Sequence, residues 1–311
     1  MKFWAIGLDC SYVYERSYVM CTSLKYKSCF GRNFDYEVSY EEQLINIPTG
    51  SFGNEYAIIG MCTGLEMDYP LLYDGMNEYG LCCSGLAFTG NAHYEKIDDV
   101  PYGDYVIPPY DFVFRILGHF KSVKEVREHL GNAHIIDETY SADFPNNDLH
   151  WHIVDSEDSI IVEQTIDGLK VYDGDVLTNN PPYPLQLEYN EWSISFVGYY
   201  RKKDKEHFTR GTETEMLDGG YTSSERFTRV SYLKKQLESS NSDFNPITET
   251  FHLLQSVEQI YGATPVEEKF EYTIYSIVYD ISKKAVWLKT YDKLCPLNFI
   301  MGNELERVDI V

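Results

Sequence analysis

Two neighbouring stretches near the carboxyl end of the chain alternate with a period of two. They read EYTIYSIVYD over residues 271–280 and KAVWLKTYD over residues 284–292, with a short turn at residues 282–284 between them. A period of two is that of a β-strand, and two such runs across a tight turn predict an antiparallel hairpin. The fold is therefore expected to contain an antiparallel sheet, on which the other segments pack.

Short strand-like runs also fill residues 21–87 and 149–180, where glycine, asparagine and proline separate them. An Asp-Gly pair at residues 74–75 and a Tyr-Gly pair at residues 79–80 are both interpreted as turns. Repeated short strands with tight turns are typical of antiparallel sheets.

Three regions depart from this strand pattern. Residues 109–130 have helical spacing, broken once near a glycine, which predicts two short helices. A capping box of Thr222 and Glu225 opens a further helix, and an Asn-Pro pair at residues 245–246 opens another. Residues 181–220 are polar, aromatic and irregular, and are expected to be a long excursion. The order of elements predicts one α+β domain with helices packed on antiparallel sheets.

Charge and cysteine usage limit the function classes. The net charge of −23 argues against binding nucleic acid or an anionic membrane through the overall field. The seven cysteines show no CxxC pair and no Cys/His spacing of a metal site, so a reducing compartment and a cytoplasmic location are expected. No stretch has the apolar length of a membrane span.

One cysteine raises a question about chemistry, because Cys21 directly follows a methionine. A reactive cysteine needs a base. His150 and His152 share one face of a predicted strand, but such a pair is more often structural. If Cys21 is the first residue of the working protein, its own α-amine, with a pKa of ~7.7, can take the thiol proton.

Such a site also needs an acceptor for the amine, a cation near the sulfur and donors for an oxyanion. Asp35 and Arg32 lie on the next predicted strand, Asn179 ends a later strand, and Arg226 begins a helix. Each has a simpler interpretation. Asp35 and Arg32 fit a plain salt bridge, Asn179 a turn former and Arg226 a surface residue.

Several motifs together resemble the choloylglycine hydrolase family, which contains bile salt hydrolases and penicillin V acylases. They are MCTSLKYKSCFGRNFDYE, YPLLYDGMNEYGLCCSGLAF, LHWHIVD, IIVEQT, VLTNNP and SSERFTRVSYL, and the resemblance runs from Met20 to about Asp292. It implies the N-terminal nucleophile hydrolase fold, in which two antiparallel sheets lie between helical layers. It also implies hydrolysis of an amide through a thioester, without metal or cofactor, and a homotetramer in which residues 181–220 serve as an assembly arm.

The resemblance assigns roles by motif. Cys21 matches the nucleophile, and the catalytic positions are Cys21, Arg32, Asp35, Asn179 and Arg226. The family has asparagine or tyrosine where this chain has Ala87, whose backbone N–H still serves as an oxyanion donor. Glu225 stands where a small residue is more usual, and the capping box explains it. The predicted substrate-binding residues are Tyr36, Tyr40, Leu65, Met67 and Phe144.

The expected substrate is a small N-acyl amide, a glycine or taurine conjugate of a bile acid, with penicillin V or another N-acyl amide as the alternative. Residues 1–20 make a poor signal peptide and are expected to be a leader or upstream extension, absent from the active enzyme. Residues 21–311 are expected to form the single domain. If residues 1–20 stay attached, the chain is expected to be a catalytically silent binding homologue, because Cys21 then has no free amine.

Overall fold

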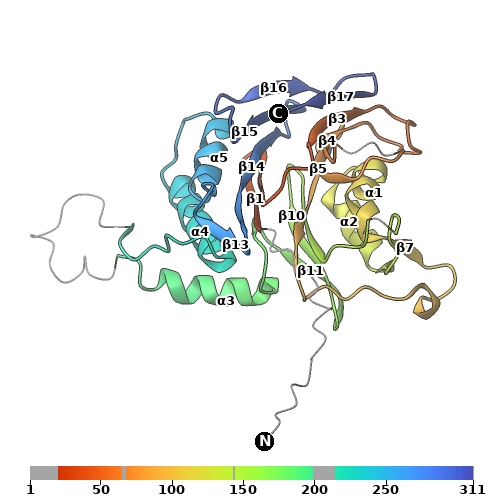
Figure 1. Cartoon of the computed structure of the whole chain (residues 1–311), viewed down its shortest axis with the longest axis horizontal. Helices are drawn as coiled ribbons and strands as arrows, with labels where there is room; N and C mark the ends of the chain where they lie inside the picture. The colour runs from red at the N-terminus through yellow and green to blue at the C-terminus, as the bar shows by residue number, and fades with distance from the viewer. Residues whose placement is uncertain (1–19, 65–67, 143, 199–213, 311) are drawn as a thin grey trace, which may run out of the picture.

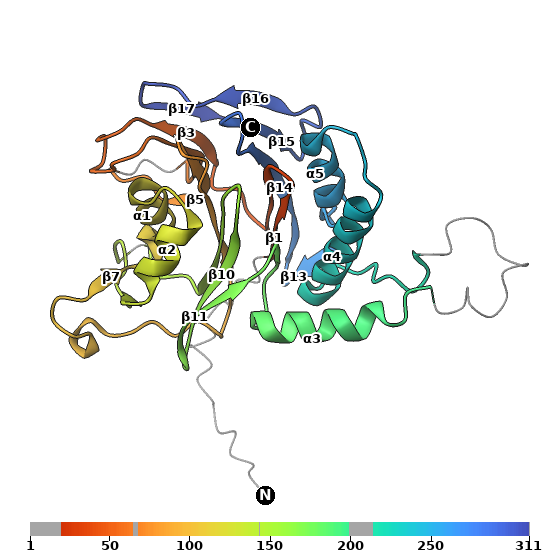
Figure 2. The same ribbon diagram turned by 180° about the vertical axis from the view of Figure 1, so that it is seen from behind.

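The computed structural model describes residues 20–64, 68–142, 144–198 and 214–310. Two antiparallel sheets face each other, and helices cover the outer face of each (Figures 1 and 2). The predicted sandwich of two sheets between helical layers is confirmed. No helix in these ranges is long and apolar enough to cross a membrane.

The first sheet contains the strand that begins next to Cys21. Its seven strands run β12 (Val176–Leu177), β1 (Met20–Tyr26), β2 (Cys29–Tyr36), β14 (Lys269–Asp280), β15 (Ala285–Thr290) and β16 (Leu297–Ile300), with β13 (Thr264–Val266) paired to β14. Helices α4 (Ser223–Ser239) and α5 (Pro246–Gln255) pack on its outer face (Figure 2). Gly31 permits this approach, because a Cβ there would meet the Thr250 methyl at 2.6 Å.

The second sheet carries the opposite wall of the interior. Its eight strands run β11 (Gly168–Asp173), β10 (Ser159–Thr165), β9 (Leu149–Val154), β6 (Cys82–Ala87), β5 (Leu72–Asn77), β4 (Ile58–Cys62), β3 (Gln43–Ile47) and β17 (Glu306–Asp309). The outer elements are α1 (Phe112–His119), α2 (Val123–Leu130), and a parallel pair of β7 (Tyr105–Ile107) and β8 (Ala133–Ile135). Two short 3₁₀ turns, Ile97–Asp99 and Pro109–Asp111, lie in the connections.

Strands β1 and β2 are buried along almost their whole length. One face of β2 packs under α5 and the other faces the second sheet, so both sets of alternating side chains are inside. Phe34 of β2 stacks on Tyr275 of β14 at 5.1 Å between ring centroids. A polar side chain on these strands is therefore held away from water.

Several predicted elements are confirmed by the structure. The hairpin is β14 and β15, with Asp280 paired to Ala285. The capping box of Thr222 and Glu225 is formed, and Asn245 accepts the Ile247 N–H at the start of α5. The predicted helix pair in residues 109–130 is α1 and α2.

Two sequence interpretations were wrong. Residues 183–194 of the predicted excursion form helix α3 (Tyr183–Ile194). Its apolar residues do not gather on one buried face, since Leu185 and Trp192 are exposed. The Asp-Gly pair at residues 74–75 lies inside β5 rather than in a turn. Its glycine is needed for close packing, since a Cβ at Gly75 would meet Leu117 of α1 at 2.8 Å.

Candidate active site

Strand β1 places Cys21 between the two strands that flank it. Cys21 pairs with Phe34 of β2 on one side. On the other side, β1 pairs Ser23 with Leu177, and continuing this register brings Asn179 opposite Cys21, just beyond the end of β12. The Cys21 N–H accordingly donates to Asn179 Oδ1 at 2.7 Å. The predicted nucleophile and oxyanion residues are thus adjacent.

A guanidinium lies beside the sulfur. Arg32 Nη2 is 3.6 Å from Cys21 Sγ and also donates to the Gly85 carbonyl at 2.7 Å. Arg32 Nη1 donates to Asp74 Oδ2 at 2.7 Å, and both side chains of this ion pair are buried. The simpler interpretation of Arg32 and Asp35 as a salt bridge is wrong, because the partner of Arg32 is Asp74.

No sequence pattern indicated that Asp74 belongs to the site. Tyr275 donates to its carboxylate at 2.6 Å, and Tyr279 donates to the other oxygen. Three donors from β2 and β14 therefore converge on one carboxylate of β5, across the space between the sheets. Because Asp74 holds Arg32 against the sulfur, it belongs to the site as a positioning residue.

Burial and charge oppose each other at the thiol. Burial raises the pKa of Cys21 above its usual value, and the neighbouring Arg32 lowers it in part. Burial also acts to lower the pKa of Arg32, but Tyr275, Cys21 and Asp74 outweigh it and keep the guanidinium charged. A buried thiol with a raised pKa needs a base before it can attack a carbonyl.

Asp35 lies on the same strand as Arg32 and directly follows Phe34, the residue that pairs with Cys21. Its carboxyl accepts hydrogen bonds from Thr273 Oγ1 at 2.6 Å and Gln259 Nε2 at 3.2 Å. Burial raises the pKa of Asp35 to about 6, although Arg226 acts to lower it. Above that pH the carboxylate is an anion, and its charge acts to raise the pKa of the Cys21 thiol.

Arg226 joins the main chain of β1 to Asn179. Its Nη1 donates to the Cys21 carbonyl and to Thr22 Oγ1, both at 2.6 Å, and its Nη2 donates to Asn179 Oδ1 at 2.8 Å. Asn179 Nδ2 donates to the Ala87 carbonyl at 2.9 Å. Arg226 is fully buried, so its interpretation as a surface residue is wrong. The chain therefore brings all the predicted catalytic positions together.

The two histidines of β9 are held by other groups. His152 bonds to Ser23 Oγ at 2.8 Å and Ser159 Oγ at 2.9 Å. His150 bonds to Glu163 at 3.1 Å and to the Thr178 carbonyl at 2.8 Å. The structural interpretation of this pair agrees with these contacts.

His152 predicts a pH dependence of stability. Burial lowers its pKa to about 3, so the ring stays neutral in the fold, whereas in the unfolded chain it gains a proton below pH ~6.5. This stabilisation is present above pH ~6.5 and is lost as the pH falls toward 3. As the pH falls from 6.5 to 5, the free energy of unfolding of the wild type should decrease by about 2 kcal/mol more than that of His152→Asn. Urea unfolding measures both. Exposed His252→Gln is the control and should follow the wild type.

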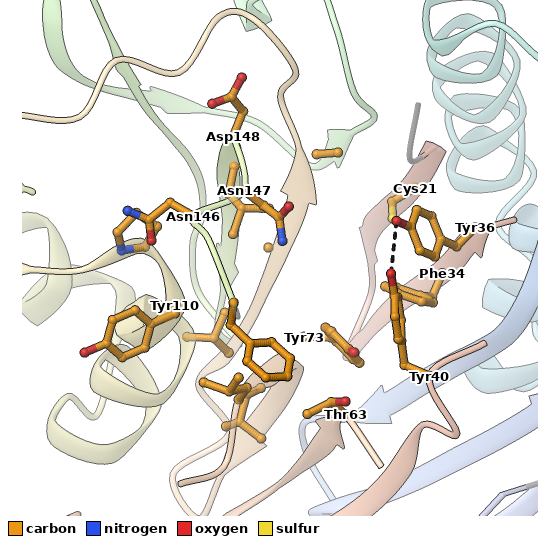
Figure 3. A pocket seen from close by; sticks show the side chains of 18 of the residues that line it. Cys21, Phe34, Tyr36, Tyr40, Thr63, Tyr73, Tyr110, Asn146, Asn147 and Asp148 are labelled. Carbon is orange, nitrogen blue, oxygen red and sulfur yellow. Dashed lines mark hydrogen bonds between the residues drawn. The ribbon is translucent and has the colours of Figure 1, made fainter. Parts of the chain in front are cut away.

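Cys21 and Arg32 line a cavity of about 590 Å³. Figure 3 shows Tyr36 and Tyr40 on the side of Cys21, with their hydroxyls 3.3 Å apart, and Asn146, Asn147 and Asp148 on the opposite side. The other lining residues include Phe34, Tyr73, Ala87, Tyr110, Tyr140 and Phe144. Of the predicted substrate-binding residues, Tyr36, Tyr40 and Phe144 line this cavity, and Leu65 and Met67 lie outside the described residues.

The cysteines and acidic side chains of the described residues show no metal centre. No group of three or more His, Cys, Asp or Glu side chains is placed there to hold an ion. The six cysteines in the described ranges are all free thiols.

The sandwich fold, with a cysteine on its first core strand, is the architecture of N-terminal nucleophile hydrolases. The model of the linear amide C–N hydrolases, choloylglycine hydrolase family, matches residues 17–298, and the chain belongs to this family. It is therefore a hydrolase of linear amides.

Two relatives are bile salt hydrolase/transferases. The one from Lactiplantibacillus plantarum is 38% identical over 88% of this chain and 90% of its own length. The one from Clostridium perfringens is 35% identical over the same shares. A crystal structure of a conjugated bile acid hydrolase variant from Clostridium perfringens matches with a TM-score of 0.83 and 33% identity, over 93% of this chain and 96% of that one. Penicillin V acylase from Agrobacterium tumefaciens, at 22% identity and a TM-score of 0.67 over 94% and 86%, shares the fold.

Proposed function

We propose that this chain hydrolyses the amide bond of glycine- and taurine-conjugated bile salts, with Cys21 as the nucleophile. The observation that carries the proposal is the position of the Cys21 sulfur, 3.6 Å from a buried guanidinium in the wall of an aromatic cavity. The two relatives from Lactiplantibacillus plantarum and Clostridium perfringens are bile salt hydrolase/transferases, and their similarity spans most of this chain.

The reaction begins with a free α-amine on Cys21, which takes the thiol proton. The sulfur attacks the amide carbonyl, and a carbon–sulfur bond forms while the carbon–nitrogen bond breaks. The protonated amine donates its proton to the leaving nitrogen, so glycine or taurine departs. Water then cleaves the thioester and releases the bile acid. In this scheme Arg32 supports the thiolate, and Asp35 and Asn179 accept hydrogen bonds from the amine.

The oxyanion donors are the Ala87 N–H and the Asn179 amide. Phe88 N–H donates to the Asp148 carbonyl on the side of β9, so the preceding N–H, that of Ala87, points to the other edge of β6. The Ala87 carbonyl faces that same edge, where it accepts from Asn179. An amide NH₂ has two hydrogens, and its second one is the donor we assign to the oxyanion. Arg226 fixes this amide through its oxygen.

The cavity suits a broad, rigid acyl group. Tyr36 and Tyr40 stack at 5.6 Å between ring centroids and offer an extended aromatic surface for a steroid. Phe144 contributes an apolar surface from the connection before β9. We assign substrate binding to these three residues and to Leu65 and Met67.

We further propose that residues 21–311 are the working domain, that the enzyme is cytoplasmic, and that it is a homo-oligomer, a tetramer by family resemblance. The six free cysteines of the described residues and the net charge of −23 support the cytoplasmic location. Leu185, Leu187 and Trp192 of α3 are exposed, and apolar side chains of this kind support a contact between subunits.

The substrate assignment is tested by product release. The protein that begins at Cys21 should release taurine or glycine from conjugated bile salts with a kcat/KM of about 10⁴ M⁻¹s⁻¹ or more. Release of phenoxyacetate from penicillin V is measured beside it and should be at least about tenfold slower. Turnover of penicillin V alone would move the assignment to the acylases, and turnover of neither would reject both.

A further inference from the structure

One buried carboxyl near the site has no role in the reaction described above. Glu271 lies on β14 and is fully buried. One of its oxygens accepts a hydrogen bond from the Met20 N–H. The other, Oε2, has no hydrogen-bond partner among the described residues. An unpaired buried oxygen destabilises a fold, so packing alone does not explain an acid at this position.

The groups that face Glu271 come from three other elements. Met20 belongs to β1, Asp35 and Glu37 to β2 and the residue after it, and Arg226 to α4. Burial raises the pKa of Glu271 to about 8, and Asp35 adds to the rise, although the Met20 N–H and Arg226 act to lower it. At neutral pH the carboxyl is therefore mostly protonated beside the ionised Asp35, and it remains an acceptor through one oxygen.

The peptide bond between Met20 and Cys21 is held from both ends. The N–H of Met20 donates to Glu271, and the N–H of Cys21 donates to Asn179 Oδ1. Met20 is in extended conformation, paired with Asp35. This bond therefore has a fixed place beside the Cys21 sulfur, and Cys21 itself is fully buried.

We propose that Glu271 is a positioning residue for the removal of residue 20. By accepting the Met20 N–H it holds the bond that follows in the site, where that bond is hydrolysed. The carbon–nitrogen bond between Met20 and Cys21 breaks, and a water molecule gives its hydroxyl to the Met20 carbonyl carbon and a proton to the Cys21 nitrogen. The inference rests on the proposed function, which requires a free amine on Cys21.

The experiment follows the loss of residues 1–20 from the purified full chain by intact mass. The wild type should lose them over time. Glu271→Gln keeps an acceptor oxygen and should process within about threefold of the wild-type rate, whereas Glu271→Met, of similar volume, should be at least about tenfold slower. Exposed Glu268→Gln removes a nearby charge and should behave as wild type.

A second variant removes the donor instead of the acceptor. Met20→Pro has no N–H at residue 20 and should also process slowly. The double variant with Glu271→Met should be no slower than the slower single variant, because both remove the same hydrogen bond. The unfolding midpoint of Glu271→Met shows whether this variant folds. If it does not, the rate of processing of Met20→Pro alone tests the inference, and a wild-type rate would reject it.

Three results would overturn the inference: a wild-type chain that keeps residues 1–20, a folded Glu271→Met that processes at the wild-type rate, or Glu271→Gln as slow as Glu271→Met. None of these readouts uses a bile salt. A chain that starts at Cys21 and carries Glu271→Met should still react at the thiol with an alkylating reagent. If this variant and the wild-type chain that starts at Cys21 both fail to hydrolyse bile salts, the proposed function is rejected, and the inference about Glu271 is not.

Discussion

The protein that begins at Cys21 is expected to hydrolyse conjugated bile salts about 10²- to 10⁴-fold faster than the chain that keeps residues 1–20. In the longer chain the nitrogen of Cys21 is an amide that donates to Asn179. An amide nitrogen does not accept a proton at neutral pH, and burial raises the pKa of the thiol, so the sulfur lacks a base. Initial rates are measured for both forms, with the fraction of each read from intact mass.

Two variants of the shorter form serve as controls. Cys21→Ala should show no detectable turnover, and Cys21→Ser, whose hydroxyl is a weaker nucleophile than a thiolate, should retain only a small fraction. Equal rates in the long and short forms would rule out the α-amine as the base. Binding of a bile salt without turnover in either form would instead identify a silent binding homologue.

Asp74→Asn is expected to destabilise the fold by about 3–5 kcal/mol, because it leaves the guanidinium of Arg32 buried without its counter-charge. The pair is 2.7 Å apart and almost fully buried. The same change releases Arg32 from its fixed position beside the sulfur, so kcat should fall as well. Urea unfolding at pH 7 measures the first effect, and the rate of thiol alkylation at Cys21 measures the second independently of substrate.

The matched control is another aspartate paired with an arginine. Asp173 lies 2.6 Å from Arg127 at the surface, and Asp173→Asn should cost less than about 1 kcal/mol because water screens that pair. An Asp74→Asn protein as stable as this control would show that Asp74 is not needed to neutralise Arg32. If Cys21 is alkylated at the same rate in Asp74→Asn as in the wild type, Asp74 does not position Arg32 beside the sulfur.

Local patterns predicted the elements that depend on nearby residues. The hairpin of β14 and β15 follows from period two across one turn, and the start of α4 follows from Thr222 and Glu225, three residues apart. The predicted catalytic positions came from motifs, and the structure brings them together around Cys21. The roles of these residues remain predictions that the experiments above address.

Contacts between distant strands could not be predicted in this way. Asp74 was interpreted as part of a turn because an Asp-Gly pair is typical of turns. In this fold Gly75 is needed for another reason, because helix α1 packs too close to leave room for a side chain. Glu271 carried no signal, since a single acid in an alternating strand usually faces solvent. The use of the Asn179 oxygen as an acceptor depends on register across β1 and β12, which no local pattern specifies.

The chemistry and the substrate walls come from different parts of the architecture. Cys21 and Arg32 sit on paired central strands, whereas Tyr40, Phe144 and Asn147 come from connections between elements. A change in a connection leaves strand register untouched, while a change on β1 or β2 disturbs every neighbouring strand. The scaffold is therefore modular: natural variation or design can exchange its loops to select new acyl groups, while the inherited reaction stays the same.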